Sequence, residues 1–575
     1  MADVPSPWQR LVAWLGGPRR YTLARFAILR LLGVVYVFAF LGIVYQGPAL
    51  LGSHGLTPVG AYVDRLHAAG LSFWDVPSVF MWSSSDHALA LWAYLGLALS
   101  VCLALGYANA PSLLVLWFLY GSYERVGQLW FGFGWEMQLL ETTVLAAAIA
   151  HPWDPRPLAP RPPPTASIVL MRWLVFRIML GAGLIKLRGD ACWRDLTCLD
   201  YHFETQPIPN PLSAWFHHLP HVVHAIGVVF NHVVEVVAPW FVFGPRRLRL
   251  VAGALMLSFQ VVLILSGNLA FLNWLTVIPV LACFDDDALL ALLPRRVRGA
   301  VARRLPEAPP RDWRQLLASG AIVAWVWLTW HYVTSFRGGE VTVERLAALP
   351  LIAGCGFGVY HAVRLVRRHG ARLDLHQLAV GALVGLVLWK SMPVVYNLAA
   401  HRQAMNRSFD RLELVNTYGA FGSVGDVRHE LVIEGTMAED PTADDAEWRA
   451  YELPCKPGDV DRRPCILGPY HLRLDWLIWF SAMDDQPSDP WILHLVWKLL
   501  DGDRTIRELI AVDPFGGKPP RWVRIRRFVY HLEPLGADTW WRRDTPEPWL
   551  PPVALDTPGF RDALEQYGWP SPSVR

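Results

Sequence analysis

The sequence predicts an α-helical polytopic membrane bundle of about eleven spans, followed by a C-terminal, β-rich extracytoplasmic domain. Three observations predict this fold class. Hydrophobic residues make up 53% of the 575 residues and charged residues only 18%, whereas soluble globular proteins carry about a quarter charged residues. Apolar runs of roughly 20 residues, the length that crosses a bilayer, recur before residue 400. The last part of the chain is instead rich in charged residues, proline and turn dipeptides.

Eleven apolar runs are candidate transmembrane helices. The first follows a basic segment and has no small-residue cleavage site after it, so it is predicted to be a span rather than a signal peptide. The runs lie at 23–45, 88–107, 112–130, 131–150, 167–187, 221–243, 250–266, 270–283, 314–334, 347–363 and 376–397. Together they define a predicted membrane domain over residues 1–400.

Basic loops predict the orientation of the spans, because Lys and Arg accumulate in short cytoplasmic loops. The most basic loops are 246–249, 295–311 and 364–372. Eleven spans with a cytoplasmic N-terminus place all three loops in the cytoplasm. The same arrangement places residues 188–220, and everything after about residue 400, on the other side. The chain is therefore expected to be a multi-pass integral membrane protein with a periplasmic or lumenal C-terminal domain.

Residues 407–575 are predicted to form that C-terminal domain. Arg428–Thr436 puts Leu431 and Ile433 on one face at strand period, and Val523 and Ile525 alternate with Arg524 and Arg526 in a second predicted strand. Pro490–Leu500 has apolar residues at helical spacing. These patterns predict a folded domain with strands and at least one helix.

Four of the seven cysteines form two local pairs in regions that the charge pattern places outside the cytoplasm. The pairs are Cys192 with Cys198 and Cys455 with Cys465. An oxidising compartment allows disulfides there, each contributing about 2–3 kcal/mol on the chain-entropy model. Free thiols and a redox-active pair are the alternatives, and the lack of a C-x-x-C motif argues against the second. The spacings do not match a zinc finger, so no metal site is predicted.

Lys186 is a candidate catalytic residue because it ends an apolar span in a run of small residues. A lysine on an apolar wall can act as a base, with possible support from His221, His224 and Glu235. The alternatives are that Lys186 reaches the outer head groups or pairs with an aspartate in the following loop. Other charged residues within the spans are expected to pair inside the bundle. They include Glu124, Arg125, Glu136, Glu141, Arg172 and Arg177.

Several functional classes receive no support. Histidines at 217, 218, 221 and 224 have spacings that metal sites use, but nearby carboxylates are sparse, so a non-metal role is favoured. There is no HExxH, P-loop, dinucleotide-binding or nucleophile-elbow motif. The net charge of only +3 gives no indication of nucleic-acid binding. No cofactor is expected either.

Long blocks of the sequence resemble the lipase maturation factor family. The most distinctive block is GAGLIKLRGDACWRDLTCLDYHFETQPIPNPLS (181–213). The other blocks follow in order over nearly the whole chain. They are RFAILRLLGVVYVFAFLGIVYQGPALLGSHGLTP (25–58), FGWEMQLLETT (133–143), NHVVEVVAPW (231–240), GNLAFLNWLT (267–276), LVNTYGAFGSV (414–424), CKPGDVDRRPC (455–465) and PYHLRLDWLIWF (469–480).

The resemblance implies a maturation or folding factor for secreted lipases or related hydrolases, with a lipase or hydrolase client and membrane lipids as partners. Animal members reside in the endoplasmic reticulum membrane and hold the C-terminal domain in the lumen. Client binding involves that domain, in which Trp476, Trp479 and Phe480 are candidate contacts; alternatively, these aromatics fill the core or touch the membrane interface. The Arg-rich usage suggests a bacterium, where the equivalent location is the inner membrane and the periplasm.

The membrane half also distantly resembles the vitamin K-dependent γ-carboxylases. In those enzymes a lysine that closes an apolar span precedes an Asp-x-Trp-like stretch, and here Lys186 precedes Asp190 and the stretch Cys192-Trp193-Arg194-Asp195. This resemblance implies an alternative function, a membrane enzyme that acts on a quinone or lipid with Lys186 as base. The maturation factor is the favoured prediction, because no full catalytic constellation is evident and a chaperone-like role requires none.

Overall fold

The computed structural model describes residues 20–306, 375–567 and 569. Six helical segments in these ranges are long and apolar enough to cross a membrane, which confirms the predicted membrane class. Each coincides with a predicted span. They are α2 (Thr22–Leu51), α4 (Asp86–Leu105), α7 (Thr165–Arg188), α11 (His221–His232) continued by η3 (Val233–Val237) and η4 (Ala238–Phe243), α12 (Arg246–Ser266) and α18 (Leu375–Ala399).

Three further predicted spans are shorter helices. They are α5 (Ala110–Val126), α6 (Gly134–Ile149) and α13 (Leu272–Val280), the last continued by η5 (Leu281–Cys283). The 16 residues of α6 reach about 24 Å at 1.5 Å per residue, less than the roughly 30 Å of a hydrocarbon core. The predicted runs 314–334 and 347–363 lie outside the described residues. The total of eleven spans therefore stays a prediction.

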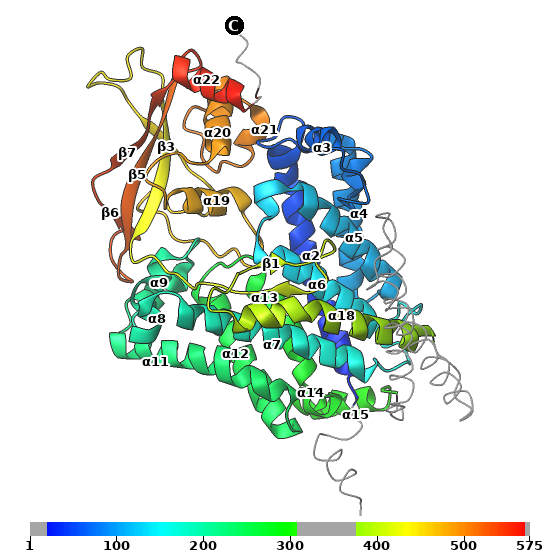
Figure 1. Cartoon of the computed structure of the whole chain (residues 1–575). Helices are drawn as coiled ribbons and strands as arrows, with labels where there is room; N and C mark the ends of the chain where they lie inside the picture. Colours follow the sequence, from blue (N-terminus) through cyan, green and yellow to red (C-terminus); the bar gives the residue numbers. More distant parts are fainter. Residues whose placement is uncertain (1–19, 307–374, 568, 570–575) are drawn as a thin grey trace, which may run out of the picture.

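The helices α2 and α4 pack closely because glycines lie at their contact. A Cβ atom at Gly33 would lie 2.3 Å from the backbone nitrogen of Ala104, and one at Gly96 would lie 2.2 Å from the ring of Phe40. Real Cβ atoms never approach so closely, and small residues are what allow membrane helices to pack at short distance. This pair forms one side of the bundle (Figure 1).

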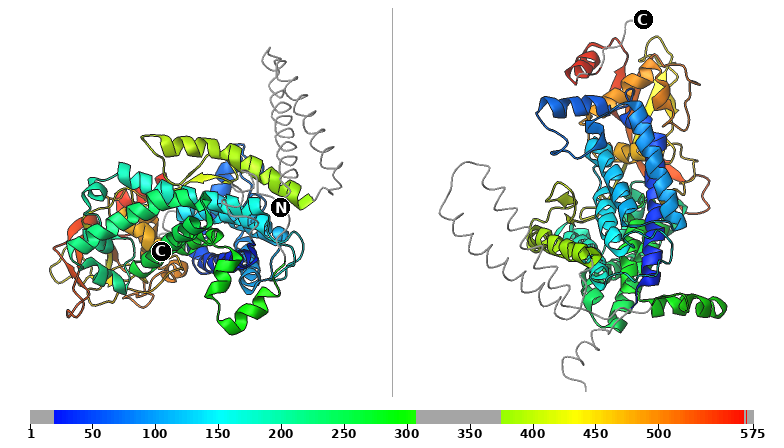
Figure 2. Two further views of the ribbon diagram at one scale, coloured as in Figure 1. Left: turned by 90° about the horizontal axis from the view of Figure 1, so that it is seen from below. Right: turned by 90° about the vertical axis from the view of Figure 1, so that its right-hand side faces the viewer.

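The loops between the helices gather at two ends of the molecule. At the end that carries α14 (Asp286–Leu292) and α15 (Arg295–Ala302), the Thr22 amide donates to the Asp286 carboxylate at 3.1 Å. The Arg25 guanidinium reaches the Ala159 carbonyl there at 2.8 Å. Figures 1 and 2 show this α14 end opposite the sheet. Residues 246–249 and the described part of the basic loop 295–311 thus lie at this end.

The remaining short elements connect the long helices. These short elements are α3 (Val59–Ala68), η1 (Val79–Met81), η2 (Gln128–Phe131), α8 (Ala191–Asp195), α9 (Leu199–Thr205) and α10 (Pro211–His217). Most of them lie at the end of the molecule opposite α14, here called the sheet end.

The C-terminal region holds a five-stranded antiparallel sheet, which confirms the predicted β-rich character of this region. Its central strands, β3 and β5, pair along their length, from Arg428 opposite Tyr530 to Thr436 opposite Trp522. β4 pairs with the free edge of β3, while β6 and β7 share the other edge of β5. The strands are β3 (Arg428–Thr436), β4 (Arg449–Tyr451), β5 (Trp522–Leu532), β6 (Trp541–Arg543) and β7 (Glu547–Val553).

Four helices accompany this sheet, the first three of them between it and the membrane helices and the fourth across the end of the sheet (Figure 1). They are α19 (Arg473–Ser481), α20 (Pro490–Asp501), α21 (Arg504–Arg507) and α22 (Pro558–Gln566). α20 is the helix predicted at 490–500. It begins with Pro490 in its first turn, where the missing N–H costs nothing, and it ends at Gly502, whose φ of 73° suits glycine.

The segment after α18 packs on the membrane helices rather than on the five-stranded sheet. Its strands β1 (Arg407–Ser408) and β2 (Asn416–Thr417) form a separate two-stranded sheet. The Tyr418 hydroxyl donates to Glu141 of α6 at 2.7 Å. Residues 407–418 are therefore attached to the bundle, and the domain boundary near residue 407 stays a prediction.

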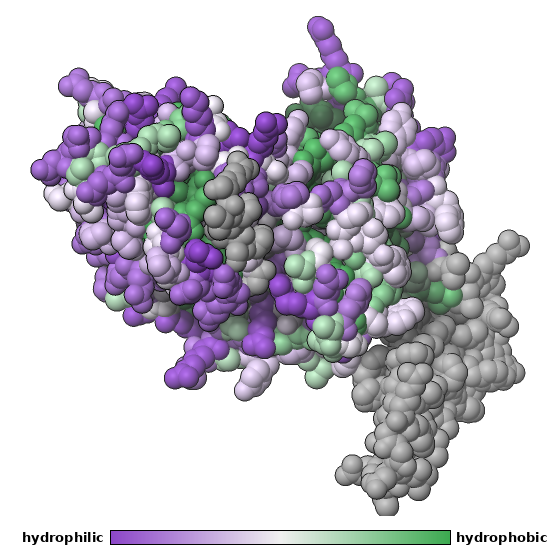
Figure 3. Space-filling view, turned by 90° about the horizontal axis from the view of Figure 1, so that it is seen from above, coloured by the Kyte–Doolittle hydropathy of each residue, from purple (hydrophilic) through white to green (hydrophobic). Residues whose placement is uncertain are grey.

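The sheet end exposes two kinds of surface. Seen from above, hydrophilic residues cover much of the side where the sheet lies, and the larger hydrophobic areas lie on the side of α4 (Figure 3). Exposed apolar residues of α4 include Leu91, Tyr94 and Leu105. This contrast fits lipid contact along α4 and water contact over the sheet.

Candidate functional site

A cavity of about 140 Å³ lies inside the bundle at its sheet end. Residues of α7, α9, α11, α12 and α13 form its walls, and Phe421 from the segment after α18 adds to them. Most of the wall is apolar. The polar side chains on it are Lys186, His202, Asn231, Glu235, Gln260, Ser266, Asn273 and Thr276.

Lys186 lies in this cavity wall and forms a buried ion pair with Glu235. Its ammonium donates to the two carboxylate oxygens of Glu235 at 2.6 and 2.7 Å, and to Oδ1 of Asn231 at 3.3 Å. Asn231 in turn donates to Glu235 at 3.0 Å, and the ring of Trp193 lies 5.2 Å from the ammonium. Lys186 and Glu235 are each only 4% exposed. The structure thus joins two of the residues that the sequence singles out.

Small residues and an irregular helix make this pair possible. A Cβ atom at Gly183 would lie 2.7 Å from a methyl carbon of Val236 and 2.9 Å from Cβ of Glu235, so glycine is what lets α7 approach this close. Glu235 itself lies in the π-helical turn η3, which widens the helix locally. Such turns shift the side chains that follow them and often occur at functional sites.

The alternative placements of Lys186 do not hold in the structure. A lysine that reaches the head groups would expose its ammonium, whereas this one is buried. The Asp190 carboxylate instead accepts the backbone N–H of Val424 at 2.7 Å. A buried charge requires a partner, and Glu235 supplies it.

The two supporting histidines lie outside the cavity. His221 and His224 both contact Asp200, at 2.9 and 2.8 Å respectively, and the second ring nitrogen of His224 contacts the Phe216 carbonyl at 2.8 Å. They hold α9 to α11 and do not line the cavity. In the part of the chain that the structure describes, no group of three or more His, Cys, Asp or Glu side chains is placed to hold a metal ion.

Six of the eight polar cavity residues are not among the candidates from the sequence, and His202 and Gln260 are two of them. His202 is buried, which lowers its pKa to about 4 because burial disfavours the charged ring and Lys186 repels it. Gln260 of α12 is 3% exposed. Polarity within a predicted span was the available signal for Gln260, whereas His202 carried no distinctive pattern.

The structure joins Cys192 with Cys198 and Cys455 with Cys465 by disulfides, the same pairs that the sequence puts forward. Both lie at the sheet end. In the described ranges two further cysteines are free thiols, the exposed Cys102 and the buried Cys283.

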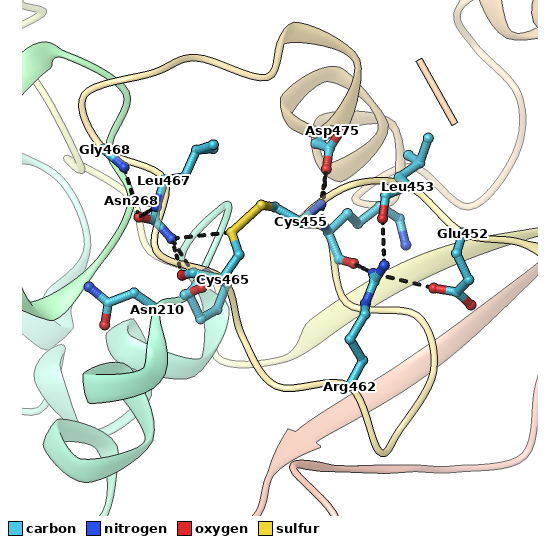
Figure 4. Close-up of a disulfide and its surroundings, with 12 residues drawn as sticks. Asn210, Asn268, Glu452, Leu453, Cys455, Arg462, Cys465, Leu467, Gly468 and Asp475 are labelled. Atoms are coloured by element: carbon cyan, nitrogen blue, oxygen red, sulfur yellow. Dashed lines mark hydrogen bonds and ion pairs between the residues drawn. A yellow bond between two sulfur atoms is a disulfide. The ribbon is translucent and has the colours of Figure 1, made fainter. Parts of the chain in front are cut away.

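The second disulfide holds a loop of the C-terminal region against the membrane helices (Figure 4). Asn268, between α12 and α13, donates to the Cys465 carbonyl at 2.9 Å and accepts the Leu467 amide at 2.9 Å. On the other side of the disulfide, the Asp475 carboxylate accepts the amides of Cys455 and Lys456, each at 2.8 Å. Burial raises the pKa of Asp475 to about 6. The disulfide therefore lies at the junction of bundle and C-terminal region.

The three candidate client contacts differ in exposure. Trp476 is 4% exposed and its ring lies 4.9 Å from that of Trp135 in α6, so it fills the core. Trp479 is half-buried and donates to the Thr205 carbonyl at 3.2 Å. Phe480 is 42% exposed. Of the three, Phe480 presents the largest free surface.

Buried ion pairs also link the C-terminal region to α6. Arg473 donates to Glu136 at 2.8 Å, and both side chains are buried. Glu141, one helical turn further on, pairs with Arg177 of α7 and accepts the Tyr418 hydroxyl. The expected pairing of charges inside the bundle therefore occurs for Glu141 with Arg177, whereas Glu136 pairs with a residue from beyond the spans.

The expected pairing is wrong for two other charged residues of the spans. Arg172 donates to the Ala282 carbonyl and the Tyr21 hydroxyl. The buried guanidinium nitrogens of Arg125 have no hydrogen-bond partner among the described residues.

Comparison with known proteins places this architecture in a family. Residues 23–291 match the model of the lipase maturation factor transmembrane domain, and residues 414–551 match that of the lipase maturation factor C-terminal domain. The chain is 41% identical to lipase maturation factor 1 of Mus musculus over 96% of this chain and 90% of the relative. It is 40% identical to human lipase maturation factor 1, over 96% and 91% of the two chains.

A second group of relatives is more distant. Human lipase maturation factor 2 is 31% identical over 95% of this chain and 85% of its own length. No solved structure matches the chain significantly. Because the two models cover both halves of the chain and the relatives extend over nearly all of it, the chain belongs to the lipase maturation factor family.

Proposed function

We propose that this chain is a membrane-bound maturation factor that helps secreted lipases or related hydrolases reach their active folded state. The observation that carries the proposal is similarity to lipase maturation factor 1 over 96% of the chain, across the membrane helices and the C-terminal region alike. The chain therefore shares the whole architecture of proteins with that name, rather than one module of it.

The proposed orientation has the α14 end in the cytoplasm and the sheet end in a lumen or periplasm. Arg246 and Arg298 lie in elements at the α14 end, in keeping with the excess of basic residues in cytoplasmic loops. Both disulfides lie at the sheet end, and disulfides persist in oxidising compartments. An endoplasmic reticulum membrane, or the inner membrane of a bacterium, satisfies both conditions.

The proposed client contact is the α19 surface, defined here as Trp479, Phe480 and Met483. Phe480 and Met483 are 42% and 50% exposed. Aromatic residues and methionine are enriched in protein interfaces, and methionine adapts to differently shaped partners. Trp476 supports this surface from beneath. A client that is still folding exposes apolar surface, which such a patch can cover.

The proposal is tested by the specific activity of a secreted lipase, measured as activity divided by lipase protein, in cells that produce this chain. A Phe480→Asp variant should lower that specific activity, because a charge would be buried on client binding. Leu535→Asp is the matched control, since Leu535 is 53% exposed in the same region between β5 and β6. Wild-type activity with Phe480→Asp would exclude the α19 surface as the client contact.

The enzymatic alternative is not supported. The matched family models and the relatives named above are lipase maturation factors. The buried pair of Lys186 with Glu235 accounts for the lysine without a reaction. A carboxylase-like activity is therefore not proposed.

A further inference from the structure

The cavity beside Lys186 holds polar groups that the fold leaves unused. Among the described residues, Oε1 of Gln260 and Nδ1 of His202 are buried and have no hydrogen-bond partner. Both side chains line the cavity, and they are 3% and 6% exposed. A buried polar atom without a partner costs about 1–3 kcal/mol. Two such atoms in one cavity indicate that a ligand completes the site.

The rest of the wall suits an apolar molecule. The aromatic rings of Phe203, Phe230, Phe259 and Phe421 line the cavity together with aliphatic side chains. A dry cavity of roughly 150 Å³ holds a benzene ring. The 140 Å³ available here therefore accepts a polar head and the first carbon atoms of a chain, but not a complete lipid.

The charges of the wall favour a neutral ligand. The ammonium of Lys186 is compensated by Glu235 at 2.6 Å. The lowered pKa of His202 keeps its ring neutral at pH 7. The described lining residues thus offer no uncompensated positive charge to a carboxylate or phosphate. An anionic ligand would be buried without a partner, which is costly.

The cavity is not fully enclosed, and the exposure of its lining on α12 points to an opening beside α11. Val262 of α12 lines the cavity and is also 40% exposed on the outside of the bundle. Gly227 and Phe230 border the cavity from α11. On α12 the outer face continues through the exposed residues Val261 and Leu265. A chain that leaves the cavity here enters the surface where lipid tails lie.

We infer that this cavity, which His202 also lines, binds a neutral lipid alcohol whose hydroxyl donates to Oε1 of Gln260 and whose chain passes between α11 and α12 into the bilayer. A hydroxyl supplies the donor that Gln260 lacks and carries no charge. The site is separate from the α19 surface. Binding is measured without any client, so it stands or falls independently of the proposed maturation role.

Photolabelling of the full-length protein in detergent tests the inference. The probe is a long-chain alcohol with a diazirine close to the hydroxyl, and labelled peptides are identified by mass spectrometry. We expect labels on residues of α7, α11 and α12 that line the cavity. Unlabelled alcohol of the same chain length should displace the probe at least tenfold better than its methyl ether, which cannot donate, or the matching carboxylate. Equal displacement by the ether, or better displacement by the carboxylate, would overturn the inference.

Variants locate the site. Ala182→Phe places a ring inside the cavity and should abolish labelling there. Gln260→Met keeps the shape of the side chain but removes the acceptor, so it should weaken binding of the alcohol roughly fivefold to tenfold. Val251→Phe adds the same ring to an exposed position of α12 that does not line the cavity, and it should leave labelling unchanged.

Folding is checked for each variant by its thermal unfolding midpoint. If Ala182→Phe does not fold, Val262→Trp at the opening takes its place, because Val262 is partly exposed and tolerates a larger side chain. Wild-type labelling in a folded Ala182→Phe or Val262→Trp protein would contradict the inferred site.

Discussion

Arg473 of the C-terminal region and Glu136 of α6 form a buried ion pair at 2.8 Å, although they are 337 residues apart. The backbone amide of Arg473 also donates to Gln46 of α2 at 2.9 Å. The C-terminal region is thus locked to the membrane helices through charges that cannot be exposed separately. A deletion of residues 407–575 would leave Glu136 buried without Arg473 and would remove the Tyr418 hydroxyl that Glu141 accepts, so point variants are the sharper tools.

Replacing Arg473 with methionine should destabilise the protein by about 3–5 kcal/mol, because Glu136 would remain buried and unpaired. The measurement is thermal or denaturant unfolding of the purified protein in detergent. The double variant Arg473→Met with Glu136→Gln should recover part of the loss. Arg521→Met is the control, because Arg521 pairs with Glu439 at 3.1 Å on the exposed surface. Exposed ion pairs contribute little to the free energy of unfolding. If Arg473→Met has the same free energy of unfolding as wild type, the ion pair does not stabilise the protein in the way described.

Replacing Lys186 distinguishes a structural from a catalytic lysine. Lys186→Met leaves Glu235 uncompensated and should lower the amount of folded protein. Adding Glu235→Gln should restore both the protein level and the lipase specific activity, because a structural role requires only that the charges match. Lys518→Met, at an exposed position, should have no effect on either readout. A double variant that is stable but inactive would instead show that the ammonium takes part in the function.

The disulfides predict a labelling pattern. Of the described cysteines, only Cys102 and Cys283 should react with a maleimide in denatured, unreduced protein, and reduction should add four reactive thiols. The variant Cys455→Ser with Cys465→Ser should lose about 2–3 kcal/mol of stability on the chain-entropy model. Cys102→Ser provides the matched comparison. Reaction of all four paired cysteines before reduction would contradict the assignment.

His202 predicts an acid-sensitive stability. Its pKa is about 4 in the folded protein against 6.5 for an ordinary histidine, so between these values the unfolded chain binds more protons. Stability contributed by the neutral ring is therefore complete above pH 6.5 and is lost as the pH falls toward 4. The slope is at most about 1.4 kcal/mol per pH unit. In His202→Phe the unfolding midpoint should change less between pH 6.5 and 4.5 than in wild type. If the midpoint depends on pH as steeply as in wild type, the assignment of this effect to His202 is refuted.

The long spans were predictable because a hydrocarbon solvent imposes both length and composition on a helix. Run lengths alone thus located α2, α4, α7, α12 and α18. They did not reveal that residues 221–243 change from α-helix to a π-helical turn at Glu235, because an apolar run carries no information about the hydrogen-bonding pattern. The strand β5 followed from alternation, since only every second residue is buried along most of it. In β3 the spacing of Leu431 and Ile433 indicated a strand, but the burial of nearly all of its residues did not follow from that spacing.

The site was only partly predictable, because pairing depends on the three-dimensional arrangement. Burial of Lys186 demanded a partner, but the choice of Glu235 over Asp190 depends on how α7 meets η3. The block that holds Arg473 and Trp476 is equally compatible with an exposed surface and with a core. Its placement follows from Glu136, a buried charge on a different helix. Gln260 was not a candidate from the sequence, because a single neutral amide within a span costs little free energy and needs no special role to explain it.

The central claim, that this chain matures a secreted lipase, is tested most directly by the lipase itself. A lipase is produced in cells with the intact chain, with no chain, and with the unstable Arg473→Met variant, and its activity is divided by its protein amount after secretion. We predict high specific activity only with the intact chain, since the other two conditions lack the folded factor. Equal specific activity in all three conditions, at equal lipase secretion, would contradict the claim.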